Sequence, residues 1–351
     1  MLRSDPAPRW LPAPCAPGAD GRTTAAAWGA TATHAIAAVR ALRHPDVRAL
    51  AALVATPSLI EARAAGVAVL EDGWRWRSLV ERRDWLAALD ADPRPLTAFL
   101  VRANARQLGR YAEALWQFWF AQLPGAEIHA AGLPVKDGAA VRGEFDFIVS
   151  LPGLPGVSHL ETGYKFFLYC PPGTEASRCV GPDPSDRLDR KWRHMQDVQL
   201  PLSQSPLGRQ ALPAALREKP ITPRACLQGY LFHPLDGALP PLPWLAPNHA
   251  RGWWHRSGTP GRWAELAPAW VELDKRAWIA PAFVGGGATS TATAGPLEPR
   301  ALQARLDAHF ATSRQARLVA GLAADGDDGW HEVTRVFVVA PDWRGADPAT
   351  A

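Results

Sequence analysis

Lysine and cysteine are both scarce in this chain, and long apolar runs are absent. Of 351 residues, five are lysine against 33 arginines, and four are cysteine, none of them in a C-x-x-C pair. The cysteine spacing argues against a zinc ribbon or a thioredoxin-type redox site. No stretch approaches the roughly 18 apolar residues of a membrane span, and the Pro-rich start lacks the apolar segment of a secretory signal. We therefore expect a cytoplasmic protein, in a reducing compartment and without a membrane partner.

The residues that are abundant describe a globular chain. Arginine, alanine and proline are frequent, as in proteins of GC-rich bacterial genomes. Hydrophobic residues make up 47% of the chain and 16 residues are tryptophan, which supplies a sizeable core and argues against disorder. The formal net charge of +4 permits an anionic partner but does not require one. Because lysine is so rare, a lysine beside a carboxylate is less readily explained by composition alone.

Periodicity predicts an α/β protein with a helical N-terminal part. The elements expected after residue 100 are a helix over 101–123, a strand near 127–131, two strands between 143 and 167, a helix over 184–200 and a strand over 225–233. The predicted organisation is a flexible tail over 1–27, a helical region over 28–100, an α/β core over 101–235 and a C-terminal extension over 236–351 with a linker near 285–296. A mixed central sheet with flanking helices accounts for this order.

Polar residues gather on one face of the two central strands. Glu144 and Asp146 alternate along the first strand, and His159, Glu161 and Lys165 alternate along the second. If these strands pair as a hairpin, their polar faces converge. Carboxylates from two adjacent strands with an ammonium group beside them suit a hard divalent cation and a phosphate.

The two predicted helices of the core add further polar candidates. Glu113 lies just beyond the apolar arc of the helix over 101–123, where a carboxylate can face a cleft. The second helix is expected to begin at Asp183 as N-cap with Pro184 at its first position. Lys191 and Gln199 lie about two turns apart on nearby faces of this helix.

This order of elements resembles the core of the PD-(D/E)XK nuclease-like phosphodiesterases. Glu113 resembles the carboxylate on the first core helix of that superfamily, Asp146 the acid on the second strand, and Glu161 with Lys165 the acid and lysine on the third. Lys191 and Gln199 stand where some members place auxiliary residues. The chain as a whole also resembles a bacterial family of uncharacterised proteins, a domain of unknown function. The resemblance implies a restriction-endonuclease-like core and action on DNA or RNA.

One departure from the superfamily pattern concerns the lysine. The pattern places lysine two residues after the acid, but Gly163 holds that position and Lys165 follows two residues later. Four residues of extended strand span about 13 Å, twice the usual separation of about 6.6 Å. Gly163 could allow a bulge or a close approach by a substrate backbone.

The expected site is a metal centre. Asp146 and Glu161 would ligate Mg²⁺ or Mn²⁺, with Glu113 completing the shell, and Lys165 would orient a water or stabilise the transition state. Each residue has a simpler alternative. Asp146 and Glu161 would be solvated strand-face acids, and Lys165 would form a salt bridge with Glu161 or Glu144.

The auxiliary candidates also have simpler alternatives. Glu113 would be an exposed helical acid, and Glu144 would serve as a supporting acid or a surface residue. His159 would ligate metal, act as a base, or lie at the surface. Lys191 and Gln199 would contact phosphate and scaffold the site, or lie on a helix surface. Tryptophans between 244 and 278 either form a stacking platform for single-stranded nucleic acid or pack in the core.

Three functions remain open from the sequence. The leading one is metal-dependent phosphodiester hydrolysis on DNA or RNA. The second is a nuclease-like module that has lost its chemistry and binds nucleic acid or a protein, for which the displaced lysine is the best support. The third is a metal-independent enzyme in which His159 and Glu161 act as an acid/base pair on a small substrate.

Overall fold

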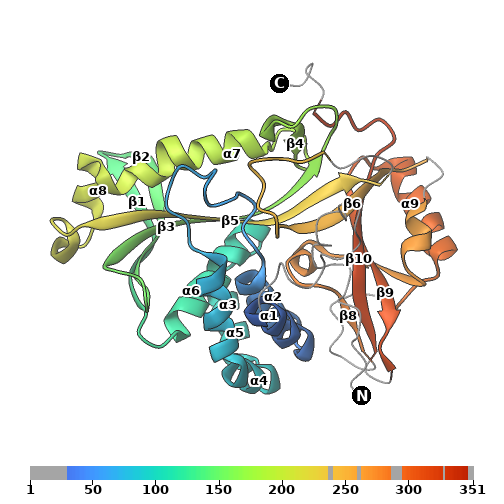
Figure 1. The fold of residues 1–351 in the computed structure, drawn as a ribbon, viewed down its shortest axis with the longest axis horizontal. Coiled ribbons are helices and arrows are strands. Elements are labelled where there is room, and N and C mark those ends of the chain that lie inside the picture. Colours follow the sequence, from blue (N-terminus) through green and yellow to red (C-terminus); the bar gives the residue numbers. More distant parts are fainter. Residues whose placement is uncertain (1–29, 236–239, 259–261, 286–294, 327–328, 347–351) are drawn as a thin grey trace.

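A single mixed β-sheet runs through the protein, with helices on both of its faces (Figure 1). The computed structural model describes residues 30–346 except 236–239, 259–261, 286–294 and 327–328, so the predicted tail and most of the predicted linker lie outside it. The ten described strands follow the order β1-β2-β3-β5-β6-β10-β9-β7, with β4 beside β3 and β8 beside β10. The three central pairings, from β3 to β10, are parallel, and the outer ones are antiparallel. The predicted α/β class with a mixed central sheet is confirmed.

The strands have the following bounds: β1 Glu127–Asp137, β2 Ala140–Ser150, β3 Val157–Tyr169, β4 Cys179–Val180, β5 Ile221–Pro234, β6 Ala250–Arg256, β7 Ala269–Leu273, β8 Phe283–Val284, β9 Arg317–Ala324 and β10 Trp330–Val339. The α-helices are α1 Ala30–Ala41, α2 Pro45–Ala55, α3 Asp72–Glu81, α4 Arg83–Ala91, α5 Arg94–Arg102, α6 Leu108–Gln122, α7 Leu188–His194, α8 Pro206–Ala211 and α9 Pro299–Thr312. The order α6, β1, β2, β3, α7, β5 is the one expected for residues 101–233, with the short β4 added before α7 and the short α8 added after it.

The central strand β3 is buried on both faces because its side chains alternate between two cores. Tyr164 and Phe166 belong to the main core, which they share with α2 and α6. Phe167 and Tyr169 belong to a second core with residues of α7 and its continuation. Helices α1–α6 thus cover one face of this part of the sheet, and α7 and α8 cover the other (Figure 1).

Two helix boundaries differ from those predicted. The single helix predicted over 101–123 begins later, at Leu108, as α6. Residues 101 and 102 belong instead to the end of α5. The second core helix begins at Leu188 and not at Pro184, because Asp186 bonds through its backbone to Asp183 and Gly181 and closes a turn there. After His194 it continues as a π-helical turn, Met195–Gln199, and a 3-10 turn, Leu200–Gln204.

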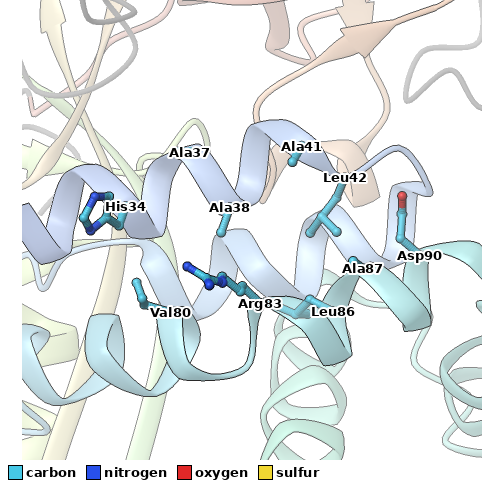
Figure 2. A pocket seen from close by; sticks show the side chains of 10 residues that line it. All are labelled: His34, Ala37, Ala38, Ala41, Leu42, Val80, Arg83, Leu86, Ala87 and Asp90. Carbon is cyan, nitrogen blue, oxygen red and sulfur yellow. The ribbon is translucent and has the colours of Figure 1, made fainter.

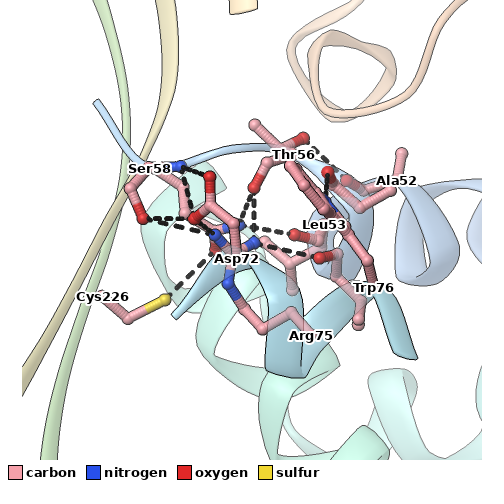
Figure 3. A network of polar contacts seen from close by, with 11 residues as sticks. Ala52, Leu53, Thr56, Ser58, Asp72, Arg75, Trp76 and Cys226 are labelled. Carbon is pink, nitrogen blue, oxygen red and sulfur yellow. Dashed lines mark hydrogen bonds and ion pairs between the residues drawn. The ribbon is translucent and has the colours of Figure 1, made fainter. Parts of the chain in front are cut away.

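The N-terminal helices are joined to the sheet by a buried arginine (Figure 3). Arg75 is fully buried and donates to the carbonyl oxygens of Val54 and Thr56 and to the Asp72 carboxylate. Gln228 of β5 donates to the same Thr56 carbonyl. These bonds satisfy backbone groups at the end of α2 that burial would otherwise leave unpaired.

The tryptophans of the C-terminal part are mainly structural. Trp263, Trp270 and Trp278 are at most 8% exposed and belong to the main core, which excludes them from a stacking platform. None of the helices in the described ranges is long and apolar enough to cross a membrane.

Candidate functional site

The site lies where strands β2 and β3 separate. Their antiparallel pairing comprises Val149–Ser158, Ile148–His159 and Phe147–Leu160. Beyond Phe147 and Leu160 the ladder of backbone hydrogen bonds ends, and the Asp146 side chain, in place of a backbone carbonyl, accepts the hydrogen bond of a β3 amide. Its Oδ2 atom accepts hydrogen bonds from the Thr162 backbone N–H at 2.8 Å and from the Thr162 hydroxyl at 3.0 Å. This insertion holds the strands apart and keeps the Asp146 carboxylate between them.

Glu161 meets Asp146 across this gap and is completely buried. Its Oε1 atom lies 2.7 Å from His159 Nε2 and 3.4 Å from the Asp146 backbone nitrogen, and its Oε2 atom accepts a 2.5 Å hydrogen bond from Gln199 Nε2. The hairpin thus brings Asp146 and Glu161 together, and neither is a solvated strand-face acid.

His159 is a buried supporting residue and not a surface histidine. Its side chain is fully buried. The Nδ1 atom lies 3.1 Å from the Ser203 hydroxyl, and the Nε2 atom lies 2.7 Å from Glu161 Oε1. Burial lowers the pKa of His159 to about 4, so the ring is neutral at physiological pH. An acid/base pair of His159 and Glu161 is not favoured by this geometry, since the His159 side chain is fully buried and both of its ring nitrogens already contact groups within the protein.

The cation whose charge acts on both acids comes from α7. Lys191 donates to Gln199 Oε1 at 2.9 Å, and its positive charge opposes the rise that burial causes in the pKa of Asp146 and of Glu161. Lys165 lies instead in a 2.7 Å ion pair with Asp186, on the segment that precedes α7. Of the two predicted lysines, the one proposed as auxiliary therefore faces the carboxylates.

Glu113 and Glu144 lie at the edge of the site and share one arginine. Arg110 Nη1 is 2.9 Å from Glu113 Oε2 and 3.0 Å from Glu144 Oε1, which links α6 to β2. Burial, together with the negative charge of Asp146, raises the pKa of Glu113. Glu113 is therefore close enough to Asp146 for their charges to interact, and the side chains of Glu113 and Glu144 are each about one-third exposed.

Desolvation dominates the electrostatics of the central acids. Burial raises the pKa of Glu161 to about 8, and burial with the charge of Glu161 raises the pKa of Asp146 to about 6. Burial also lowers the pKa of Lys191, although both acids oppose this. Such shifts, produced by burial next to charged partners, are characteristic of functional sites.

A cavity of about 220 Å³ opens beside these residues, lined by Gly109, Ala112, Glu113, Trp116, Thr162, Gly163, Tyr164, Lys165 and Lys191. A larger cavity of about 420 Å³ lies among α1, α3 and α4 (Figure 2). Its lining is mostly alanine and leucine, with His34 and Asp90 at opposite ends and Arg83 between them. We place the site at the smaller cavity, because Glu113 and Lys191, whose charges act on Asp146 and Glu161, line it.

The donor chemistry of the site suits a hard divalent cation. Glu113, Asp146 and Glu161 offer carboxylate oxygens, and buried carboxylates with raised pKa values are groups that a cation would stabilise. In the described part of the chain, however, no three His, Cys, Asp or Glu side chains are already arranged to hold a metal ion. Cation binding would require Glu161 to exchange a hydrogen bond for a ligand bond.

Sequence reasoning missed three residues of the site. Thr162 points away from Glu161 along an ideal strand, so period-two alternation gave no reason to place it on Asp146. Ser203 lies in an irregular 3-10 turn and carried no signal. A sequence signal did exist for Arg110, because an arginine and a glutamate three residues apart on a helix are neighbours, and Glu113 is three residues after Arg110.

Comparison with known proteins places the chain in a family. A sequence profile described as a domain of unknown function, DUF1853, matches residues 48–339. The protein belongs to the DUF1853 family. The match begins in α2 and ends with β10, so it includes the whole site and the whole sheet. No curated protein and no solved structure matches this DUF1853 protein.

Proposed function

We propose that this DUF1853 protein is a divalent-cation-dependent phosphodiesterase that acts on DNA or RNA. The observation that carries the proposal is the meeting of Asp146 with the buried Glu161 from adjacent strands, under the charge of Lys191, which lines a cavity together with Glu113. The resemblance of the element order and acidic positions to the PD-(D/E)XK nucleases supports the same chemistry.

The charges of the site agree with a divalent cation. Four carboxylates, Glu113, Glu144, Asp146 and Glu161, contribute −4 when ionised, and Arg110 and Lys191 contribute +2, which leaves −2. One Mg²⁺ or Mn²⁺ would neutralise this charge. When bound, such an ion lowers the pKa of a coordinated water and offsets charge on a phosphate.

The side chains then have separate roles. Asp146, Glu161 and Glu113 would hold the cation through oxygen. Lys191 lines the cavity, where its ammonium would stabilise negative charge on a phosphate oxygen. Gln199 bonds both Lys191 and Glu161 and so fixes their separation.

Hydrolysis assays on defined variants test the proposal. Wild-type protein with Mn²⁺ or Mg²⁺ is expected to cleave end-labelled single- or double-stranded DNA or RNA, whereas Asp146→Asn and Glu161→Gln are expected to lose at least about a hundredfold in rate. Asp137→Asn, at an exposed acid of β1, is the matched control and should keep full activity. Thermal melts establish that each variant is folded. Retained turnover in both site variants would exclude the assignment.

A binding module without catalysis is the second candidate. The observation in its favour is that both oxygens of Glu161 are already used within the protein. It predicts binding of nucleic acid or of a protein that persists in EDTA, with no hydrolysis under any metal condition. Binding that disappears on chelation would count against it.

A further inference from the structure

Arg110 is held in place by one of its nitrogens and offers the others to solvent. Its Nη1 atom serves both Glu113 and Glu144, while Nε and Nη2 donate to no residue in the described part of the chain. The side chain is 59% exposed. The Nε–Nη2 edge, which has no partner among the described residues, carries two parallel N–H groups, the geometry that recognises two oxygens of one phosphate.

The position of this edge relates it to the cavity. Arg110 lies in the first turn of α6, between Gly109, which lines the cavity, and Tyr111, and one turn before Glu113, which also lines it. The ion pair with Glu144 ties the guanidinium to β2, the strand that carries Asp146. Two acids on different elements thus fix the direction of an otherwise flexible side chain.

We infer that Arg110 binds a phosphate of the substrate backbone through its Nε–Nη2 edge, with Glu113 and Glu144 as positioning residues. This inference rests on the proposed function and deepens it, because it assigns a contact to a phosphate next to the one that is cleaved. The ligand it implies is a polyanion with successive phosphates. A single phosphate monoester would lack the second group that reaches Arg110.

The test is binding of a fluorescein-labelled ten-nucleotide oligothymidylate, followed by fluorescence anisotropy in EDTA, where hydrolysis plays no part. Arg110→Ala should weaken binding about tenfold, the loss expected for two charge-assisted hydrogen bonds. Arg110→Lys keeps the positive charge but loses the pair of parallel N–H donors, and should still weaken binding about threefold or more. Arg106→Ala removes an equal charge at an exposed position four residues earlier, in the segment before α6, and should change the affinity about twofold or less.

Salt dependence separates a specific contact from a general field. The slope of log affinity against log salt concentration should fall by about 0.7 in Arg110→Ala, as for one lost phosphate contact on a single strand. Equal effects of Arg110→Ala and Arg106→Ala, or no binding by the wild-type protein, would overturn the inference. The proposed function fails separately, through absence of cation-dependent hydrolysis in the wild-type protein.

Discussion

Lys191 occupies the space that Gly163 leaves open. A Cβ atom built on Gly163 would lie 3.5 Å from Lys191 Cε, so the aliphatic part of this lysine passes over the glycine on its way to Gln199. Gly163 is the position two residues after Glu161 where the nuclease pattern carries lysine. The positive charge of an ammonium group on a helix therefore acts on the carboxylates, and Gln199 bridges it to Glu161, although the strand position itself has no side chain.

This relationship predicts which lysine supports hydrolysis. Lys191→Met should reduce the rate by about 10²–10³-fold through loss of charge stabilisation, whereas Lys165→Met should reduce it by less than about threefold. The reason is that Lys191 acts on both carboxylates, while Lys165 is paired with Asp186. Rates measured at saturating Mn²⁺ check this, and the reverse ranking would return the role to Lys165.

A lysine transplanted to position 163 should restore part of the activity lost without Lys191. In Lys191→Ala the remaining neighbours of a new Cβ at position 163 are a Leu227 methyl group at 3.0 Å, which can move, and Met195 Cε at 3.9 Å, an ordinary contact. The double variant Gly163→Lys/Lys191→Ala should recover at least about tenfold over Lys191→Ala alone, as long as both remain folded in thermal melts. No recovery would mean that the ammonium group acts only from the helix.

The protein without metal should become more stable as the pH falls from about 8.5 to 6.5. The folded-state pKa of Glu161, about 8, lies above the ordinary value of 4.5, so the folded protein binds more protons than the unfolded chain in this range. Proton binding to the folded state raises the free energy of unfolding by roughly 1–2 kcal/mol over this interval. Below pH 6.5 the lowered pKa of His159 acts in the opposite direction, because the unfolded chain then takes up the proton. Urea titrations at several pH values measure the effect, which Glu161→Gln should largely remove.

Cation affinity should depend on pH for the same reason. Because Glu161 must lose its proton before it can act as a ligand, Mn²⁺ binding should strengthen by up to about tenfold per pH unit between 6.5 and 7.5. Calorimetry in two buffers of different ionisation enthalpy should also show proton release on binding. The Asp137→Asn control should keep the same slope. A pH-independent affinity would contradict ligation by Glu161.

Stability of the helical part can be changed without changing the site. Arg75→Met should lower the free energy of unfolding by about 2–4 kcal/mol, since it removes one buried charged donor from Asp72 and from the carbonyls of Val54 and Thr56 (Figure 3). Arg77→Met, at an exposed position of the same helix, should change it by less than about 0.5 kcal/mol. Urea unfolding measures both, and Mn²⁺ affinity should be the same in the two folded variants.

Much of the core could be predicted from residue patterns. The alternation of Glu144 with Asp146 and of His159 with Glu161 indicated two strands, and the short connection between them favoured a hairpin, which β2 and β3 form. The apolar arc of α6 was equally clear. The start of α7 was predicted wrongly, because Asp183 and Pro184 are as suitable for a turn as for a helix start, and tertiary contacts decided between them.

The sequence by itself determined the class of fold, the strands that carry the acids, and the chemical types of group available to the site. Only the tertiary structure decided how those groups combine. Period-two alternation places side chains on a face of a strand, but it does not show where two paired strands separate. The strands separate at Asp146, and there the Thr162 backbone N–H and hydroxyl donate to the Asp146 carboxylate. The choice between Lys165 and Lys191 depended on a contact between residues far apart in the chain. The burial that raises the pKa of Glu161 comes from elements packed over β3, which no local pattern records.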